Sequence, residues 1–291
     1  MRDVKEKAIE VFLSLNALSI IFILLAIFAF IAFTGLQFFS EVNPAEFFLG
    51  TKWDPTTYVE PSWGMLNLLM GTLLIAVGAL GFAIPLGIAS AIYLSKIASE
   101  RARGILKPFI EMIAAIPSVV LGLFGLLVLA PLIANLFGIP NGLNALTASV
   151  LVGFMALPTI ISISEDALSS VPRSYEEASY ALGATKWETI KKVTVPASKS
   201  GIIASLMLGF GRVIGETMVV VMVAGNAIAM PTSFLDPVRP MTANIAIEAQ
   251  EVVQGSLHYE GLFAIATILF IMTFGVNTLA DWVIHRGGGP K

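Results

Sequence analysis

The chain has 291 residues, of which 56% are hydrophobic and 13% are charged; its net charge is -3 and its mean hydropathy is +0.86. Soluble globular domains carry about 25% charged residues, so the composition excludes an ordinary soluble protein and indicates a membrane protein with several spans. The absence of cysteine excludes disulfides, thiolate metal ligands and a cysteine nucleophile. His258 and His285 fit no metal-ligand spacing, so we expect no metal site.

The apolar segments predict six transmembrane helices and an all-α protein. A spanning helix needs about 20 apolar residues. Residues 11–40 contain no charge, which favours a retained first helix over a cleaved signal. The uncharged stretch 112–164 is too long for one helix, and the turn signal GIPNGLN at 138–144 divides it. The expected spans are 16–38, 65–95, 108–136, 145–164, 200–226 and 261–284.

The basic residues predict which ends of these helices face the cytoplasm. Fourteen Lys and Arg residues fall in the two termini and in the loops after the second and fourth spans. The three opposite loops contain only Lys52 and Arg239, and Arg212 lies inside the fifth span. Because cytoplasmic loops are enriched in Lys and Arg, we expect both termini in the cytoplasm.

The loop 165–199 has the pattern of two short helices. Glu176 and Glu177 suit the first turn of a helix that begins after Pro172, since acidic groups favour helix N-termini. Gly183 permits a sharp turn, and Trp187 starts a second apolar stripe. By periodicity alone, this pair is equally well interpreted as an amphipathic anchor lying on the membrane surface.

The same loop resembles the EAA loop of ABC-importer permeases. Glu177-Ala178-Ser179 is followed after three residues by Gly183, and after nine more by Val193-x-Val195-Pro196. Ser179 replaces the second Ala of the family pattern, and valines replace its usual Ile and Leu. The resemblance implies that the loop docks on an ATP-hydrolysing subunit, with the coupling residues Glu177, Ala178, Gly183, Trp187 and Pro196.

Three further runs resemble the PstC-type permease subunit of phosphate importers. They are GFGRVIGETMVVVMVAGN at 209–226, AAIPSVVLGLFGL at 114–126 and RPMTANIAIE at 239–248. The resemblance implies a type I ABC importer permease fold in the cytoplasmic (inner) membrane. Its divisions are an N-terminal part (1–64) with the tail, first helix and external loop, a core at 65–284 with coupling loop 165–199, and a tail at 285–291.

The resemblance also implies the partners and the chemistry. The expected partners are a second, related permease in a heterodimer, two ATPase subunits, an external phosphate-binding protein and membrane lipid, with no nucleic acid. No phosphate loop of the form G-x-x-x-x-G-K-[ST] occurs in the chain. We therefore expect a transport subunit that is not an enzyme and has no cofactor of its own, with ATP bound by the partner ATPase.

Arg212 and Glu216 are charged residues within the expected fifth span. At spacing i, i+4 on one helix they can reach each other, and a buried pair of this kind is one way to lock helix packing. The alternative is an anion site, since a guanidinium binds phosphate or carboxylate oxygens bidentately. Glu216 would then hold Arg212 until an anion takes its place, and this exchange would keep the anion from binding too tightly for release. Other polar candidates for the anion pathway are Thr217, Asn226, Ser118 and Thr159, the last two each directly after a proline.

The function predicted from the sequence is import of inorganic phosphate driven by ATP. A permease for another oxyanion, such as molybdate or sulfate, stays open as an alternative. A secondary transporter or channel that uses the Arg212 and Glu216 pair as a proton-linked gate is the rival from another class. The EAA-like loop favours the ABC importer, because a secondary carrier has no use for an ATPase-docking element.

Overall fold

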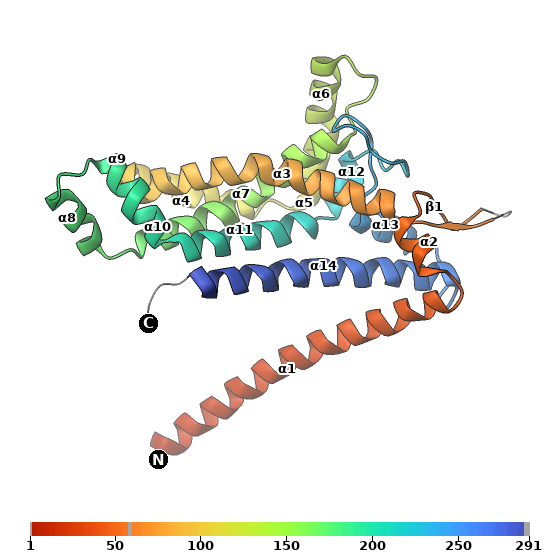
Figure 1. The fold of residues 1–291 in the computed structure, drawn as a ribbon, viewed down its shortest axis with the longest axis horizontal. Coiled ribbons are helices and arrows are strands. Elements are labelled where there is room, and N and C mark those ends of the chain that lie inside the picture. Colours follow the sequence, from red (N-terminus) through yellow and green to blue (C-terminus); the bar gives the residue numbers. More distant parts are fainter. Residues whose placement is uncertain (1, 58–59, 288–291) are drawn as a thin grey trace.

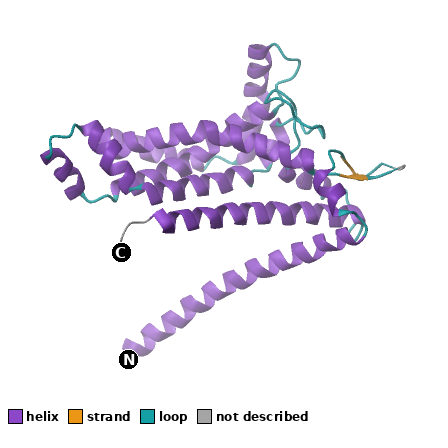
Figure 2. Cartoon of the chain, in the orientation of Figure 1, coloured by secondary structure: helices purple, strands orange, loops and turns teal. Residues whose placement is uncertain are grey.

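The structure is a computed structural model that describes residues 2–57 and 60–287. The described residues are helical apart from loops and one short hairpin of β1 (Trp53–Asp54) and β2 (Ser62–Trp63), as Figure 2 shows. The prediction of an all-α membrane protein is therefore confirmed.

Four helices form the bundle that runs along the long axis of Figure 1: α3 (Leu66–Ile92), α7 (Ala145–Ser169), α11 (Lys199–Ile214) and α14 (Leu257–Gly287). Small residues let α3 and α7 pack closely. Ala79 and Ala83 are fully buried, and a Cβ at Gly153 would lie 2.7 Å from the Ala79 carbonyl oxygen. Close backbone approach through small residues is typical of membrane helices.

The first helix, α1 (Arg2–Gln37), packs against α14 through residues in its C-terminal half. Phe28 stacks on Phe270 of α14 with ring centroids 4.6 Å apart, and Gly35 lies against the backbone of Phe263. Toward its N-terminus α1 diverges from α14 (Figure 1), and apolar side chains such as Phe12 and Phe22 are exposed. Such a long apolar surface indicates contact with lipid or with another subunit.

The third expected span, 108–136, is not one continuous helix. The chain forms α4 (Glu100–Ala114), breaks, and continues as α5 (Ser118–Phe124), a π-helical turn (Gly125–Leu129) and α6 (Ala130–Phe137). Pro117 causes the break because it has no N–H to donate and disfavours helical geometry in the residue before it. The segment long and apolar enough to span is Ser118–Phe137.

The fifth expected span, 200–226, is also interrupted. Helix α11 ends at Ile214, and α12 (Met218–Val223) begins after a break at 215–217. In the described residues, five helices are individually long and apolar enough to cross a membrane. The bent pair of Lys186–Ala197 and Lys199–Ile214, with 70° between its parts, would bring the number to six. Its bounds differ from the predicted span 200–226, because that span overlaps only Lys199–Ile214 and α12.

The two ends of the bundle differ in structure. At one end, α2 (Pro44–Leu49), the hairpin and α13 (Met241–Glu248) surround a cluster of buried aromatic side chains that includes Phe38, Phe47 and Trp53. At the other end lie α8 (Arg173–Ala181), α9 (Lys186–Thr189) and α10 (Val195–Ala197). The start of α1 and the end of α14 are both at the end that carries α8 (Figure 1).

Candidate functional site

Helices α8 and α9 are joined by a turn that depends on Gly183. Its φ is +82°, a left-handed conformation that side-chain-bearing residues rarely adopt. The Gly183 N–H donates to the Tyr180 carbonyl at 2.9 Å, and the Ala184 N–H donates to the Ser179 carbonyl at 3.2 Å. This is a glycine helix terminus, so the predicted turn at Gly183 is confirmed.

The second short helix has its own start signal. The Thr185 hydroxyl accepts from the Glu188 N–H at 3.3 Å, and a Glu188 carboxylate oxygen accepts from the Thr185 N–H at 3.0 Å, which forms a capping box. Ser179, the departure from the family pattern, has its hydroxyl 2.9 Å from that of Thr189, and both side chains are buried. That contact fixes α8 against α9.

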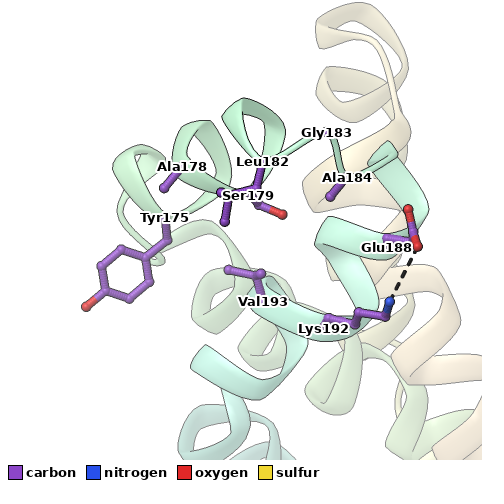
Figure 3. Close-up of a pocket in the computed structure, with 9 residues that line it drawn as sticks. All are labelled: Tyr175, Ala178, Ser179, Leu182, Gly183, Ala184, Glu188, Lys192 and Val193. Carbon is purple, nitrogen blue, oxygen red and sulfur yellow. Dashed lines mark hydrogen bonds and ion pairs between the residues drawn. The ribbon is translucent and has the colours of Figure 1, made fainter.

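A groove of about 490 Å³ lies between the two short helices (Figure 3). It is lined by Tyr175, Ala178, Ser179, Leu182, Gly183, Ala184, Glu188, Lys192 and Val193. Leu182 is 90% exposed and the nearby Trp187 is 61% exposed. Large apolar side chains presented around a groove at the tip of a rigid segment are typical of a protein docking surface.

The predicted coupling residues lie in different parts of this segment. Ala178 and Gly183 line the groove, Glu177 and Trp187 are exposed beside it, and Pro196 is in the first turn of α10, where a missing N–H is tolerated. Glu176, which sequence reasoning treated only as a helix-start residue, makes the structural contact instead. Its carboxylate is 2.6 Å from Nζ of Lys96 and accepts from the Thr194 hydroxyl at 3.3 Å.

Arg212 lies in the last turn of α11 and does not pair with Glu216. Its Nε donates to the Met155 carbonyl of α7 at 3.1 Å, and the side chain is otherwise exposed on the single chain. Oε1 of Glu216 accepts from the Val219 N–H at 3.1 Å and so caps α12. The expected i, i+4 contact is wrong because α11 ends at Ile214, before the glutamate.

The polar residues around this break mostly bond to the backbone. The Thr217 hydroxyl donates to the Gly215 carbonyl at 3.2 Å, and the Thr242 hydroxyl of α13 donates to the Glu216 carbonyl at 3.0 Å. Asn226 has φ of 53°, and its Nδ2 donates to the Val221 carbonyl at 2.7 Å. These hydrogen bonds satisfy backbone carbonyls at the 215–217 break and at the end of α12.

Ser118 and Thr159 lie on α5 and α7, which contact α12 and Arg212 respectively. Ser118 begins α5, which packs against α12 where Gly122 faces the Met222 side chain. Thr159 is partly buried on α7, one turn beyond the Met155 carbonyl that holds Arg212. Arg212, Glu216 and Thr217 thus lie at or beside the break, whereas Asn226 lies in the loop after α12, and Ser118 and Thr159 lie on α5 and α7.

Two ionic clusters were missed by the sequence analysis. Glu165 of α7 is fully buried and bonded to Arg103 and, at 2.7 Å, to Nζ of Lys107. Hydrogen bonds to Glu165 and then Asp166 raise the pKa of Lys107 above its usual range. The i, i+4 spacing of Arg103 and Lys107 was the available signal, since it places both cations on one helix face.

The second cluster centres on Glu248 at the opposite end. Its carboxylate is 3.1 Å from Nη1 of Arg239 and 2.8 Å from Nε2 of His258, and it accepts from the Trp53 indole N–H at 2.9 Å. His258, which looked isolated in the sequence, is therefore part of the contact that joins β1, α13 and α14.

An interrupted bundle of membrane helices with a two-helix segment at one end is also found in solved structures of ABC transporters. The alginate ABC transporter in complex with its pentasaccharide-bound periplasmic protein has a chain that matches with a TM-score of 0.62, at 15% identity, over 94% of each chain. The inward-facing MetNI methionine ABC transporter matches with a TM-score of 0.58, at 17% identity, over 78% of this chain and 95% of that chain.

Residues 83–286 match the model of the family described as "Binding-protein-dependent transport system inner membrane component". The chain belongs to this family. A probable ABC transporter permease protein, YqgH of Bacillus subtilis, is 38% identical over 90% of this chain and 85% of its own length. The phosphate transport system permease protein PstC of Mesorhizobium japonicum is 35% identical over 82% of this chain and 78% of its own length.

Proposed function

We propose that this chain is the permease subunit of an ATP-driven importer that moves inorganic phosphate across the cytoplasmic membrane. The observation that carries the proposal is the similarity to phosphate permeases over most of the chain. It holds for Mesorhizobium japonicum and also for Haemophilus influenzae PstC, which is 34% identical over 82% of this chain and 81% of its own length.

Arg212 is the residue that we assign to the anion. Its Nε donates to the Met155 carbonyl, which orients the guanidinium of this exposed residue and leaves the two terminal nitrogens without a hydrogen-bond partner among the described residues. That geometry suits two parallel hydrogen bonds to an oxyanion. Glu216 shapes the site indirectly, because its carboxylate caps α12 and its carbonyl holds Thr242 of α13. Thr217, Asn226, Ser118 and Thr159 line the route on either side of the break.

The segment α8–α9 is the ATPase coupling element in this proposal. The groove, the exposed Leu182 and Trp187 and the rigid Gly183 turn together suit insertion into a complementary surface of an ATPase subunit. This assignment requires α8 in the cytoplasm, and both termini with it, in agreement with the distribution of Lys and Arg. ATP is bound by the partner ATPase, and this chain needs no cofactor.

The other partners follow from the surface and from the family. A second, related permease would cover the exposed apolar faces beside the Arg212 break, forming a heterodimer. Two ATPase subunits would receive the coupling segments of the two permeases. An external phosphate-binding protein would deliver the anion at the end that carries α13 and the hairpin.

The test is transport by the purified complex in proteoliposomes. The chain is isolated with the subunits that co-purify, and uptake of radiolabelled phosphate is measured with ATP inside and binding protein outside. We expect uptake that needs ATP and resists excess sulfate and molybdate. Uptake of one of these anions in preference to phosphate would assign the permease to another oxyanion, and uptake without any ATPase subunit would overturn the importer.

A further inference from the structure

Two sets of polar side-chain contacts, joined through the backbone of the adjacent residues Ser95 and Lys96, lead from the coupling segment to α4. Glu176 of α8 is 2.6 Å from Nζ of Lys96, at the end of the α3 helix. Ser95, the residue directly before Lys96 in the chain, has its hydroxyl 3.1 Å from the hydroxyl of Ser169 on α7. The Ser169 hydroxyl donates to the Glu165 carboxylate at 2.9 Å. Glu165 accepts from Lys107 of α4 at 2.7 Å. We call these six residues the polar relay: Glu176, Lys96, Ser95, Ser169, Glu165 and Lys107.

Helix α4 is attached to α7 by the ionic contacts of Arg103 and Lys107 with Glu165. No side chain of α4 is buried, and its apolar residues Ile105, Phe109 and Met112 point away from the protein and are exposed. A hollow of about 380 Å³ lies between α4 and α3, bounded by Leu106 and Ile110 on the α4 side. The position of α4 therefore depends on the ionic contacts of Arg103 and Lys107 with Glu165 more than on apolar packing.

The buried charge of Glu165 makes this attachment hard to break. The side chain is inaccessible to solvent, and both its oxygens are engaged by the cations of α4. An unpaired carboxylate at such a position is strongly disfavoured. When the surroundings of Glu165 shift, α4 is accordingly expected to move with it instead of separating from it.

Both residues that bond to Glu176 lie in irregular helical turns. Lys96 is in a π-helical turn (Tyr93–Ile97), and Thr194, which also bonds to Glu176, is in a second one (Ile190–Thr194). Turns of this kind occur mostly at functional positions and are less regular than the α-helix. We expect these two π-helical turns to let the helix ends beside α8 shift by a residue while the membrane spans stay helical.

We propose that Glu176 and Lys96 are positioning residues that pass the movement of the coupling segment through the polar relay to α4. This inference rests on the proposed function. When an ATPase shifts α8, the Glu176 and Lys96 pair moves the end of α3, and Glu165 carries α4 along. Helix α4 leads through the Pro117 break into α5, which packs against α12 beside the Arg212 site. The relay thereby joins ATP hydrolysis to the anion pathway.

The first experiment measures coupling in the purified complex. Lys96→Gln and Glu176→Gln are compared with the charge swap, Lys96→Glu combined with Glu176→Lys, by recording phosphate uptake and ATP hydrolysis in the same proteoliposomes. We expect each single variant to assemble and hydrolyse ATP while the phosphate moved per ATP falls about fivefold or more, the lower end of typical coupling effects. The swap should recover most of this ratio.

The matched control is Lys52→Gln, which removes an exposed ion pair with Asp54 at the opposite end and should leave the ratio unchanged. An unchanged ratio in both single variants would overturn the relay. So would an equal loss of uptake and hydrolysis without recovery in the swap, because that is the signature of a purely structural pair. Failure of the wild-type complex to move phosphate with ATP would instead refute the proposed function.

The second experiment observes α4 directly. Because the chain has no cysteine, spin labels can be attached at Arg101→Cys on α4 and Leu279→Cys on α14, a helix outside the relay; both positions are exposed. The distance between the labels should change when the wild-type complex is trapped with ATP and vanadate. Glu176→Gln should abolish this change while ATPase binding persists. The same change in the variant would contradict the proposal.

Discussion

At the scale of single residues, the contact that matters at the candidate anion site is the bond between Arg212 and a backbone carbonyl. A carbonyl acceptor fixes the direction of the guanidinium without neutralising its charge. A carboxylate partner would have occupied the paired N–H donors of the guanidinium and would have competed with an incoming anion. The separation of Arg212 from Glu216 therefore favours anion binding over the packing lock that the sequence also allowed.

Replacing Arg212 tests this assignment. Arg212→Lys keeps the charge but loses the fork, and a hydrogen bond to a charged group contributes about 1.5–3 kcal/mol, so phosphate uptake should fall about tenfold or more. Arg212→Gln should abolish uptake, and adding Glu216→Gln should not restore it, since no ion pair is left broken. Uptake is normalised to assembled complex, with Arg101→Gln as the control. Recovery of phosphate uptake in the double variant would instead support the alternative, in which Arg212 and Glu216 serve only to hold the helices together.

At the scale of elements, the helices adjoining the pathway are interrupted and those of the inner bundle are closely packed. Pro117 breaks the third span, and the fifth stops at Gly215 and restarts with Glu216 as a cap. Non-helical backbone is tolerated at membrane depth only where it is buried or lines a polar cavity. The helices that follow the two interruptions, α5 and α12, pack against each other at Gly122 and Met222, and our proposed anion site is placed beside this contact.

The close packing of α3 on α7 can be measured at Gly153. A Cβ there would lie 2.7 Å from the Ala79 carbonyl oxygen, so Gly153→Ala should destabilise the chain by about 1–3 kcal/mol through overpacking. Gly275→Ala on α14 is the control, because nothing lies within 4 Å of the added methyl group. Thermal unfolding in detergent measures both. Equal midpoints for the two variants would show that α3 and α7 are less closely packed than described.

At the scale of the whole molecule, much of the apolar surface has no partner within the chain. The exposed residues of α1 and the outer faces of α4, α5 and α6 are too extensive for contact with water. Within the described residues, the α8–α9 segment lies at one end of the bundle, and α13 and the hairpin lie at the other (Figure 1). This shape suits a subunit embedded in lipid and in a larger assembly.

The orientation of the chain in the membrane can be tested by cysteine labelling. We expect Gln254→Cys, in the exposed loop after α13, to react with a membrane-impermeant maleimide in intact cells, and Lys186→Cys, at the start of α9, to react only after permeabilisation. The physical reason is that Lys and Arg stay on the cytoplasmic side. The chain without cysteine is the background control. The reverse labelling pattern would invert the topology and remove the coupling assignment.

The sequence by itself determined the class of protein and several local features. Low charge content and long apolar segments specify membrane helices wherever they occur, because the cost of burying backbone and charge in lipid is local. The Gly183 turn was also predictable, since a left-handed residue is set by its own backbone. The expected sidedness follows from counting Lys and Arg and stays a prediction, as does the division of the chain at residue 65.

Only the tertiary structure decided which charged residues meet. Arg212 finds its partner on α7, Glu176 rather than Glu177 reaches Lys96, and Glu165 collects two cations from α4. These partners are dozens of residues apart in the chain, and helical periodicity relates only residues within one continuous helix. Because α11 ends before Glu216, the i, i+4 spacing no longer predicts a contact between Arg212 and Glu216. The packing of helices against one another determines which residues Arg212 and Glu216 contact.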